Sequence, residues 1–177
     1  MNIKATYFFL ITFLSLAACT PKVTEVVEKP SKNSPAEVKT APLPFQPVKT
    51  YVVTSIKTTP CYGKCPVYEA KLYSNGKAVW IGKKFTKREG KFETNVSKDK
   101  IQEIREEAKL RGIFFMEDSY PAQRKLFITD LPNTIISISN GATPKVITNN
   151  HKAPKNLIAF EDYLKDFFEN LDWGDKG

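Results

Sequence analysis

Two closely spaced cysteines are the most distinctive chemical feature of the sequence. Cys61 and Cys65 enclose the tripeptide Tyr-Gly-Lys, and Pro60 and Pro66 lie directly outside them. The glycine permits a tight bend, which brings two Cα atoms within disulfide range. The surroundings of an exported protein are oxidising, so such a pair closes into a disulfide. The spacing therefore favours a small structural disulfide, and a loop this short fixes local shape more than overall stability.

Metal or redox chemistry is the alternative use of the same cysteines. Two thiolates and an imidazole are soft ligands that suit Cu(I), and His151 is the single histidine of the chain. The Cys-x-x-x-Cys-Pro segment with the distant histidine is similar to the metal motif of thioredoxin-like copper chaperones of cytochrome oxidase assembly. Those proteins place the second cysteine at the start of a helix, whereas residues 67–73 alternate in the manner of a strand. Copper or thiol-redox handling by Cys61, Cys65 and His151 is therefore kept as the alternative, and we expect no bound metal or cofactor.

The third cysteine, Cys19, ends an amino-terminal segment that has the features of an export signal. Lys4 precedes an uncharged apolar stretch, residues 5–18, which is shorter than the roughly 20 residues of a membrane-spanning helix. We interpret residues 1–18 as a cleaved signal peptide. The last three residues of this peptide and the cysteine that follows, Leu-Ala-Ala-Cys, resemble the lipobox of bacterial lipoproteins. This resemblance implies that Cys19 is the lipidation site. Two or more acyl chains on one cysteine give stable membrane attachment.

The residues after Cys19 indicate a location and a tether. Thr20, rather than an acidic residue, follows the cysteine, which resembles outer-membrane sorting in lipoproteins of double-membraned bacteria. We expect a lipid-anchored protein of the bacterial cell envelope, held in the outer membrane and facing the periplasm or the cell surface. Residues 20–49 hold six of the 12 prolines and none of the glycines. This composition buries too little apolar surface to fold, so residues 19–49 are interpreted as the lipidated cysteine and a flexible Pro-rich tether.

Residues 50–177 are expected to form one folded domain in which alternating strands position the cysteines. Asn75-Gly76 and Asn140-Gly141 each predict a hairpin, and the first is expected to be a type I′ turn with positive φ at both residues. Residues 113–133 have no clean period and are interpreted as an irregular connection. The predicted strands are 51–58, 67–73, 77–81, one or two within 83–96, 134–139 and 145–148.

Two helices complete the predicted domain. Ser97 is expected to cap the first, which runs to about Arg111 and is followed by Gly112 in a left-handed conformation. Pro154 begins the second. The expected buried residues are Ile101, Ile104 and Ala108 in the first helix and Leu157, Phe160, Leu164, Phe167, Phe168 and Leu171 in the second, with Glu161, Asp162, Asp166 and Glu169 on the polar face of the second. The order of elements predicts an α+β fold: a single antiparallel sheet of about five to seven strands with two helices packed on one face.

Several segments together resemble a bacterial domain-of-unknown-function family found in lipoproteins. The family is typified by a Cys-aromatic-Gly-x-Cys-Pro motif, which residues 61–66 match. Looser matches are residues 73–76, 82–90, 129–132 and the start of the final helix at 153–154. The resemblance implies no activity. It places Asp130 in a recurrent feature, although an aspartate before Leu-Pro is typical of a turn, and we favour that interpretation.

Charge and the motifs that the sequence lacks narrow the function. The chain has 27 Lys and Arg against 19 Asp and Glu, a formal net charge of +8. No nucleophile elbow, phosphate-binding glycine loop or zinc-protease motif occurs, which favours a non-catalytic protein. We therefore expect a binding or structural module of unknown ligand, whose partners are the membrane through acylated Cys19 and an envelope protein or an anionic wall or lipid component, not nucleic acid. Candidate contacts to an anionic surface are Lys83, Lys84, Lys87, Arg88 and Lys91.

Overall fold

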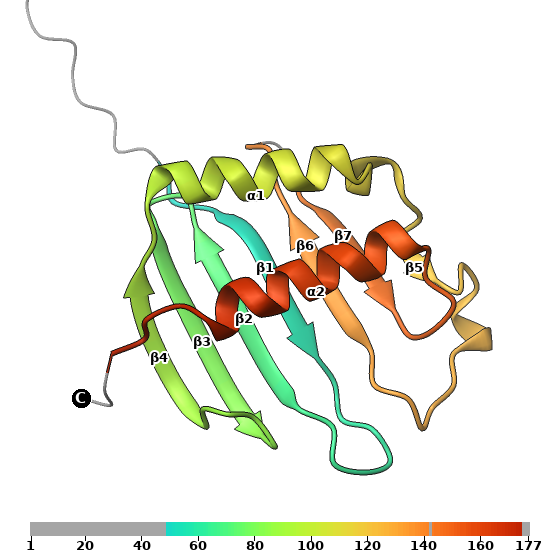
Figure 1. Cartoon of the computed structure of the whole chain (residues 1–177). Helices are drawn as coiled ribbons and strands as arrows, with labels where there is room; N and C mark the ends of the chain where they lie inside the picture. Colours follow the sequence, from blue (N-terminus) through green and yellow to red (C-terminus); the bar gives the residue numbers. More distant parts are fainter. Residues whose placement is uncertain (1–48, 142, 175–177) are drawn as a thin grey trace, which may run out of the picture. The chain divides into compact units, whose positions relative to one another are not determined.

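The computed structural model describes residues 49–141 and 143–174. In this part of the chain one open sheet of seven strands carries two α-helices, and both helices lie across the same face of the sheet (Figure 1). The predicted α+β fold is therefore confirmed. The predicted signal peptide, Cys19 and most of the predicted tether lie outside the described residues.

The bounds of the main strands agree closely with those predicted from the sequence, and the predicted hairpins are present. The order across the sheet is β4-β3-β2-β1-β6-β7-β5, and neighbours pair antiparallel except at one edge. That edge strand, β5, pairs parallel with β7. The strands are β1 (Val52–Thr58), β2 (Val67–Tyr73), β3 (Lys77–Lys84), β4 (Gly90–Asn95), β5 (Ser119–Tyr120), β6 (Thr134–Ile138) and β7 (Lys145–Asn149).

The turn between β2 and β3 differs from the predicted type I′ turn. Gly76 has a φ of 91°, but Asn75 does not have a positive φ. The Gly76 N–H donates to the Tyr73 carbonyl (2.9 Å), so the glycine closes a longer loop instead of forming the second half of a two-residue turn. A side chain at Gly76 would also collide with the Val96 carbonyl oxygen, 2.6 Å from an ideal Cβ. Glycine is therefore required at this position by the backbone of Val96, which follows β4, as well as by its own turn.

The segment between the helix α1 (Lys98–Leu110) and β6 was predicted to be irregular, and it holds three short elements. They are the 3-10 turns η1 (Ile113–Phe115) and η2 (Arg124–Leu126) and the strand β5. Backbone hydrogen bonds from β7 and the residue after it to Asp118 and Tyr120 hold this edge. A two-residue strand leaves no periodicity in a sequence, so its parallel pairing could not be predicted.

The helices confirm most of their predicted ends and faces. The Ser97 Oγ accepts from the Lys100 N–H (3.3 Å) and caps α1, and Gly112 adopts the left-handed conformation with a φ of 70°. The second helix, α2 (Lys155–Glu169), has Pro154 as its N-cap residue. One assignment was wrong: Glu161, placed on the polar face of this helix, is buried against the sheet.

The core lies between the helices and the sheet. Its residues are those of one face of each strand, for example Tyr68, Ala70 and Leu72 of β2, and the apolar stripes of the helices. Trp80 and the carboxy-terminal Trp173 extend it toward the β4 edge, where their rings lie 6.1 Å apart. None of the helices in the described residues is long and apolar enough to cross a membrane.

Candidate functional site

Cys61 and Cys65 form a disulfide with Cα atoms 5.8 Å apart, as the spacing predicts. The loop that carries it joins β1 to β2 and packs against the segment before β6 through hydrogen bonds. The Thr59 N–H donates to the Asn133 carbonyl (3.0 Å), and the Tyr62 N–H donates to the Asp130 carbonyl (3.1 Å). Asp130 therefore lies in a turn beside the disulfide loop, and its backbone makes the contact.

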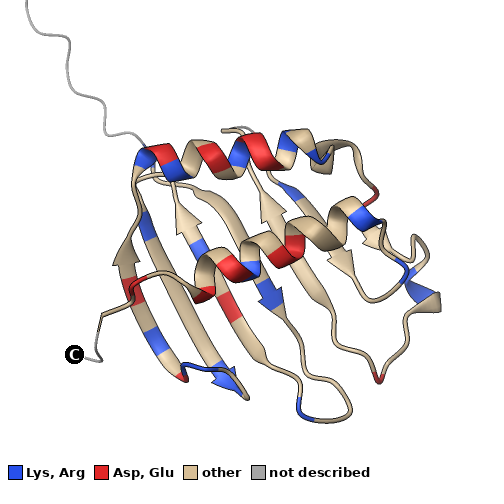
Figure 2. Ribbon diagram, viewed as in Figure 1, with Lys and Arg blue, Asp and Glu red and all other residues tan. Residues whose placement is uncertain are grey.

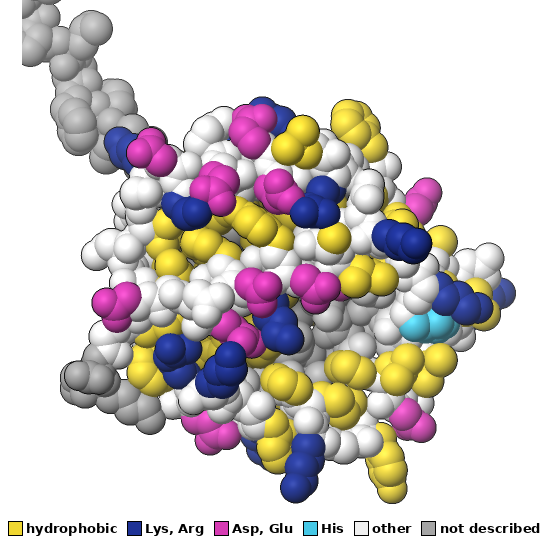
Figure 3. Space-filling view, in the orientation of Figure 1, with side chains coloured by type: hydrophobic (Ala, Val, Ile, Leu, Met, Phe, Trp, Pro, Cys, Tyr) yellow, Lys and Arg dark blue, Asp and Glu magenta, His cyan; other side chains and the backbone are white. Residues whose placement is uncertain are grey.

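A cavity of about 250 Å³ lies next to this loop, between α2 and the ends of three strands. The space-filling view shows the surface hollowed here, beneath α2 (Figure 3). Both polar and apolar groups face the cavity. Its lining residues are Ile56, Thr58, Cys65, Pro66, Tyr68, Pro132, Thr134, Glu161, Asp162 and Lys165.

A second hollow, of about 350 Å³, continues the first along α2. The two share Pro66, Tyr68 and Lys165, so together they form one feature, which we call the disulfide-end groove. The second hollow is otherwise lined by Trp80, the segment 85–88 and Glu169. One wall of the groove is therefore α2, and the other includes the disulfide and the loop between β3 and β4.

Glu161 is the buried acid of the groove, with an exposed fraction of 8 %. Its Oε2 accepts from the Asn149 Nδ2 (2.8 Å), whereas its Oε1 has no hydrogen-bond partner among the described residues. Burial raises the pKa of Glu161 to about 7, the charge of Asp162 adds to the rise, and the Asn149 hydrogen bond opposes it. The carboxyl group therefore keeps its proton to a higher pH than an exposed glutamate does.

Tyr68 forms the floor shared by the two hollows. Its ring stacks on that of Trp80, with centroids 4.6 Å apart and an interplanar angle of 11°. The Trp80 Nε1 donates to the Arg88 carbonyl (3.0 Å), which fixes the β3–β4 loop over the ring pair. Burial raises the pKa of the Tyr68 phenol, and the charges of Glu169 and Glu161 raise it further. The phenol therefore stays protonated and offers an O–H donor to the groove.

The predicted basic cluster does not form one patch. Lys87 pairs with the Glu169 carboxylate (2.9 Å), and Arg88 donates to the Glu169 carbonyl (3.2 Å), so both are turned toward α2. Lys91 pairs with Glu93 (2.8 Å) on β4. Lys83 and Lys84 line a separate hollow of about 360 Å³ on the other side of the disulfide, together with Cys61 and Cys65. Figure 2 shows basic and acidic residues interspersed over this view of the domain.

His151 contacts its chain neighbour Asn150 and does not share a hollow with the disulfide cysteines. Its Nδ1 lies 2.8 Å from the Asn150 Oδ1, and the Asn150 side chain also bonds both backbone groups of Ile128. His151 lines neither of the hollows that contain a disulfide cysteine. Within the described ranges, no three His, Cys, Asp or Glu residues are arranged to hold a metal ion.

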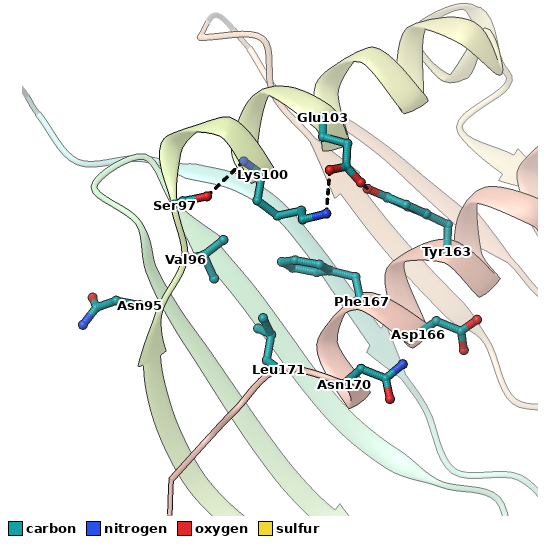
Figure 4. Close-up of a pocket in the computed structure, with 10 residues that line it drawn as sticks. All are labelled: Asn95, Val96, Ser97, Lys100, Glu103, Tyr163, Asp166, Phe167, Asn170 and Leu171. Carbon is teal, nitrogen blue, oxygen red and sulfur yellow. Dashed lines mark hydrogen bonds and ion pairs between the residues drawn. The ribbon is translucent and has the colours of Figure 1, made fainter.

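A further hollow lies between the two helices and has a different character. Phe167, Leu171 and Val96 form its floor, and polar side chains surround them (Figure 4). At its rim the Lys100 ammonium pairs with Glu103 (2.5 Å), which also accepts from the Tyr163 hydroxyl (3.1 Å). All of these rim groups are exposed or half-buried and have partners. This shallow helix–helix hollow lacks the unsatisfied buried group that marks the disulfide-end groove.

Sequence reasoning found the disulfide but missed Glu161, Asn149 and Lys165. A signal for Glu161 was available: it follows Leu157 by four residues and precedes Leu164 by three, so it occupies the apolar stripe of α2. Lys165 had a signal too, since it follows Glu161 by four residues on the same helix. Asn149 had none, because its contact with Glu161 depends on how the helix crosses the sheet.

Comparison with known proteins identifies a domain family. No curated protein matches the chain. Residues 52–168 match the family model described as Domain of unknown function (DUF6438). This range includes the disulfide and every lining residue of the disulfide-end groove except Glu169. The match extends over more than half of the chain. The chain therefore belongs to the DUF6438 domain family.

Proposed function

We propose that the protein is a lipid-anchored component of the bacterial cell envelope whose domain is a non-catalytic binding module. Acylation of Cys19 would attach it to the outer membrane, and residues 20–49 would tether the domain to that anchor. The observation that carries the binding role is the disulfide-end groove, a hollow with a buried carboxyl oxygen left without a partner among the described residues. The wider partner is an envelope protein or an anionic wall or lipid component.

The position of the groove supports this role. The described chain begins at Lys49, and β1 (Val52–Thr58) leads from that end of the domain to the disulfide loop. Seven strand residues at about 3.3 Å each separate the two ends of β1 by roughly 20 Å. The groove therefore opens at the end of β1 opposite to the one that the tether joins. A tethered domain with this arrangement can present the groove to a partner while its other end is attached.

The chemistry of the groove favours binding over catalysis. Its two cysteines are bonded to each other, so neither offers a thiolate. Among the described residues that line it, one carboxylate is buried and no histidine is present. Asp162 and Glu169 also belong to the lining, and the buried Glu161 among them offers an acceptor to a bound ligand.

Lysine footprinting in intact envelopes tests the proposal without knowledge of the ligand. Lys165 is exposed in the free domain and lines the groove, whereas Lys155 is equally exposed on the same helix and lines none of the hollows described above. An occupied groove slows modification of Lys165 by an amine-reactive reagent several-fold in envelopes relative to the purified protein, and leaves Lys155 unchanged. Equal reactivity of Lys165 in the two preparations would contradict a ligand in the groove.

A further inference from the structure

We propose that the Glu161 end of the disulfide-end groove binds a protonated amine carried on an apolar stem. This inference rests on the proposed binding function and names the class of ligand. The relevant chemistry is that of an alkylammonium group, whether it belongs to a free amine or to the side chain of a lysine-like residue.

The buried carboxyl group of Glu161 lacks one hydrogen bond among the described residues. Glu161 is more than nine-tenths buried, lines the cavity, and uses only Oε2 with a described residue. An ionised carboxylate only accepts hydrogen bonds, and a buried acceptor without a donor is costly. Glu161 differs in this from an amide, whose oxygen and nitrogen can exchange places to suit a neighbour. The missing group is therefore a donor, and it must come from outside the described residues.

The other buried side-chain atoms without a partner in the described residues are acceptors, like Glu161 Oε1. Buried side-chain atoms without a partner in the described part of the chain are Glu161 Oε1, Asn149 Oδ1 and Asn133 Oδ1, and all three are acceptors. Asn149 bonds Glu161, which lines the cavity, whereas neither asparagine is itself among the lining residues. An ammonium group carries three N–H donors. It suits this environment better than a hydroxyl, which carries one.

The rest of the cavity wall suits an apolar stem and a positive charge better than an anion. Ile56, Pro66 and Pro132 give an apolar lining for a hydrocarbon stem, and about 250 Å³ accommodates a short one. An anionic ligand would bring a second negative charge beside the buried carboxyl group of Glu161, which is unfavourable in a poorly solvated site. Lys165 is the basic residue of the lining, and it is exposed at the mouth, so its ammonium group can turn to solvent.

The charged groups around Glu161 determine how binding depends on pH. Asp162 and Lys165 face the cavity from α2 and Tyr68 faces it from β2, whereas β1, β6 and β7 contribute Thr58, Thr134 and Asn149, which do not ionise. Asp162 is exposed, whereas Glu161 is buried. Ionisation of Glu161 is therefore the step that controls amine affinity between about pH 5 and pH 8, and affinity rises with pH across this range.

Calorimetric titration of the full chain with pentylammonium tests the inference, with pentanol as the uncharged probe of the same stem. We expect pentylammonium to bind and pentanol to bind at least tenfold more weakly, roughly the value of one charge-assisted hydrogen bond in a buried site. Glu161→Gln keeps the side-chain shape and an oxygen for Asn149, and it removes the charge; we expect it to weaken pentylammonium binding by about tenfold. Asp162→Asn removes the exposed neighbouring charge and is the matched control, with an expected change of less than about twofold.

Three results would overturn the inference: no pentylammonium binding, equal binding of pentanol, or Glu161→Gln binding as tightly as the parent. The carboxyl carbon signal of Glu161 in the unmodified chain gives a second readout that does not depend on a variant folding, and it must shift when the amine is added. Comparison of pentylammonium with Nα-acetyl-lysine amide, whose side-chain ammonium group is free, separates a free amine from a lysine side chain as the source. Protection of Lys165 in envelopes together with absent amine binding would overturn this inference alone, whereas absent protection would overturn the proposed function.

Discussion

Glu161 combines a position typical of an apolar residue with the chemistry of an acid. It lies in the stripe of α2 that includes Leu157 and Leu164, and it is packed against the sheet. Its burial favours the neutral form of the carboxyl group. The residue therefore makes the free energy of unfolding depend on pH, and it also offers an acceptor to a ligand. These two properties can be measured separately.

The stability of the domain is expected to fall as the pH rises from about 4.5 to about 7. In this window the folded protein holds a proton on Glu161, whose pKa is about 7, while the unfolded chain has lost it at the ordinary value of 4.5. The unfolded state therefore binds fewer protons, and unfolding becomes easier with rising pH. The difference between the two pKa values corresponds to a loss on the order of 3 kcal/mol, measured as the free energy of unfolding in urea.

Glu161→Gln is the variant that isolates this effect. Glutamine does not titrate, so the variant should show a nearly flat free energy of unfolding between pH 5 and pH 7.5. Glu69, Glu103 and Glu106 have lowered pKa values and lose their favourable interactions only as the pH falls below about 4.5, outside this window. A decline with pH that is the same in Glu161→Gln as in the parent would mean that another group is responsible.

At the scale of single residues, the sequence predicted what local rules determine. Ser97 and Gly112 were predicted at the ends of α1 because capping depends on neighbours in the chain, and Cys61 and Cys65 were paired by their spacing. Glu161 was misplaced because an acid was assigned to solvent by its residue type, although its spacing was that of the buried stripe. The unsatisfied Oε1 could not be predicted, since it depends on which groups the sheet brings to the helix.

At the scale of elements, Gly82 holds the β3–β4 loop against the sheet. An ideal Cβ at Gly82 would lie 1.8 Å from the Arg88 carbonyl oxygen, the same oxygen that accepts from Trp80. We expect Gly82→Ala to displace this loop and to lower the free energy of unfolding by about 2–4 kcal/mol, because backbone cannot move aside at small cost.

Gly112→Ala is the control for Gly82→Ala. Gly112 has a positive φ but nothing within 4 Å of an ideal Cβ, so alanine there should cost only about 1 kcal/mol from backbone strain. Urea unfolding of both variants measures the difference. If both variants lose the same free energy of unfolding, the close approach of the Arg88 carbonyl is not the reason that position 82 needs glycine.

The disulfide element is expected to stabilise the domain modestly. Cys61 and Cys65 are separated by only four positions, and the chain entropy removed by closing so short a loop corresponds to about 2 kcal/mol. The double variant Cys61→Ser, Cys65→Ser should therefore keep a cooperative unfolding transition and the near-UV signal of the stacked Tyr68 and Trp80, with a free energy of unfolding lower by about this amount. Loss of the folded state in that variant would show that the loop holds the fold together.

The elements themselves were largely predictable, and their connections were not. Alternation identified the main strands, since each has one face toward the helices. The turn at Asn75-Gly76 was predicted with the wrong geometry because the role of Gly76 includes contact with Val96, which lies just after β4. The parallel contact of β5 with β7 joins residues far apart in the chain, and no local pattern records it.

At the scale of the whole molecule, the two faces of the sheet differ. The helices cover one face, and the other carries neighbouring charges that pair with one another, such as Lys71 with Glu69 and Lys77 with Glu93. Paired surface charges contribute little to stability and are typical of a solvated face. The disulfide-end groove lies at one end of the helix-covered face, opposite to the end where the described chain begins.

The central claim is that this domain works from a membrane anchor at Cys19, and labelling of growing cells with an alkyne-bearing fatty acid tests it most directly. The predicted result is label on the unmodified protein and on Cys61→Ser, which retains the anchor cysteine, with no label on Cys19→Ala. An unlabelled parent protein, or label that persists in Cys19→Ala, would contradict the claim.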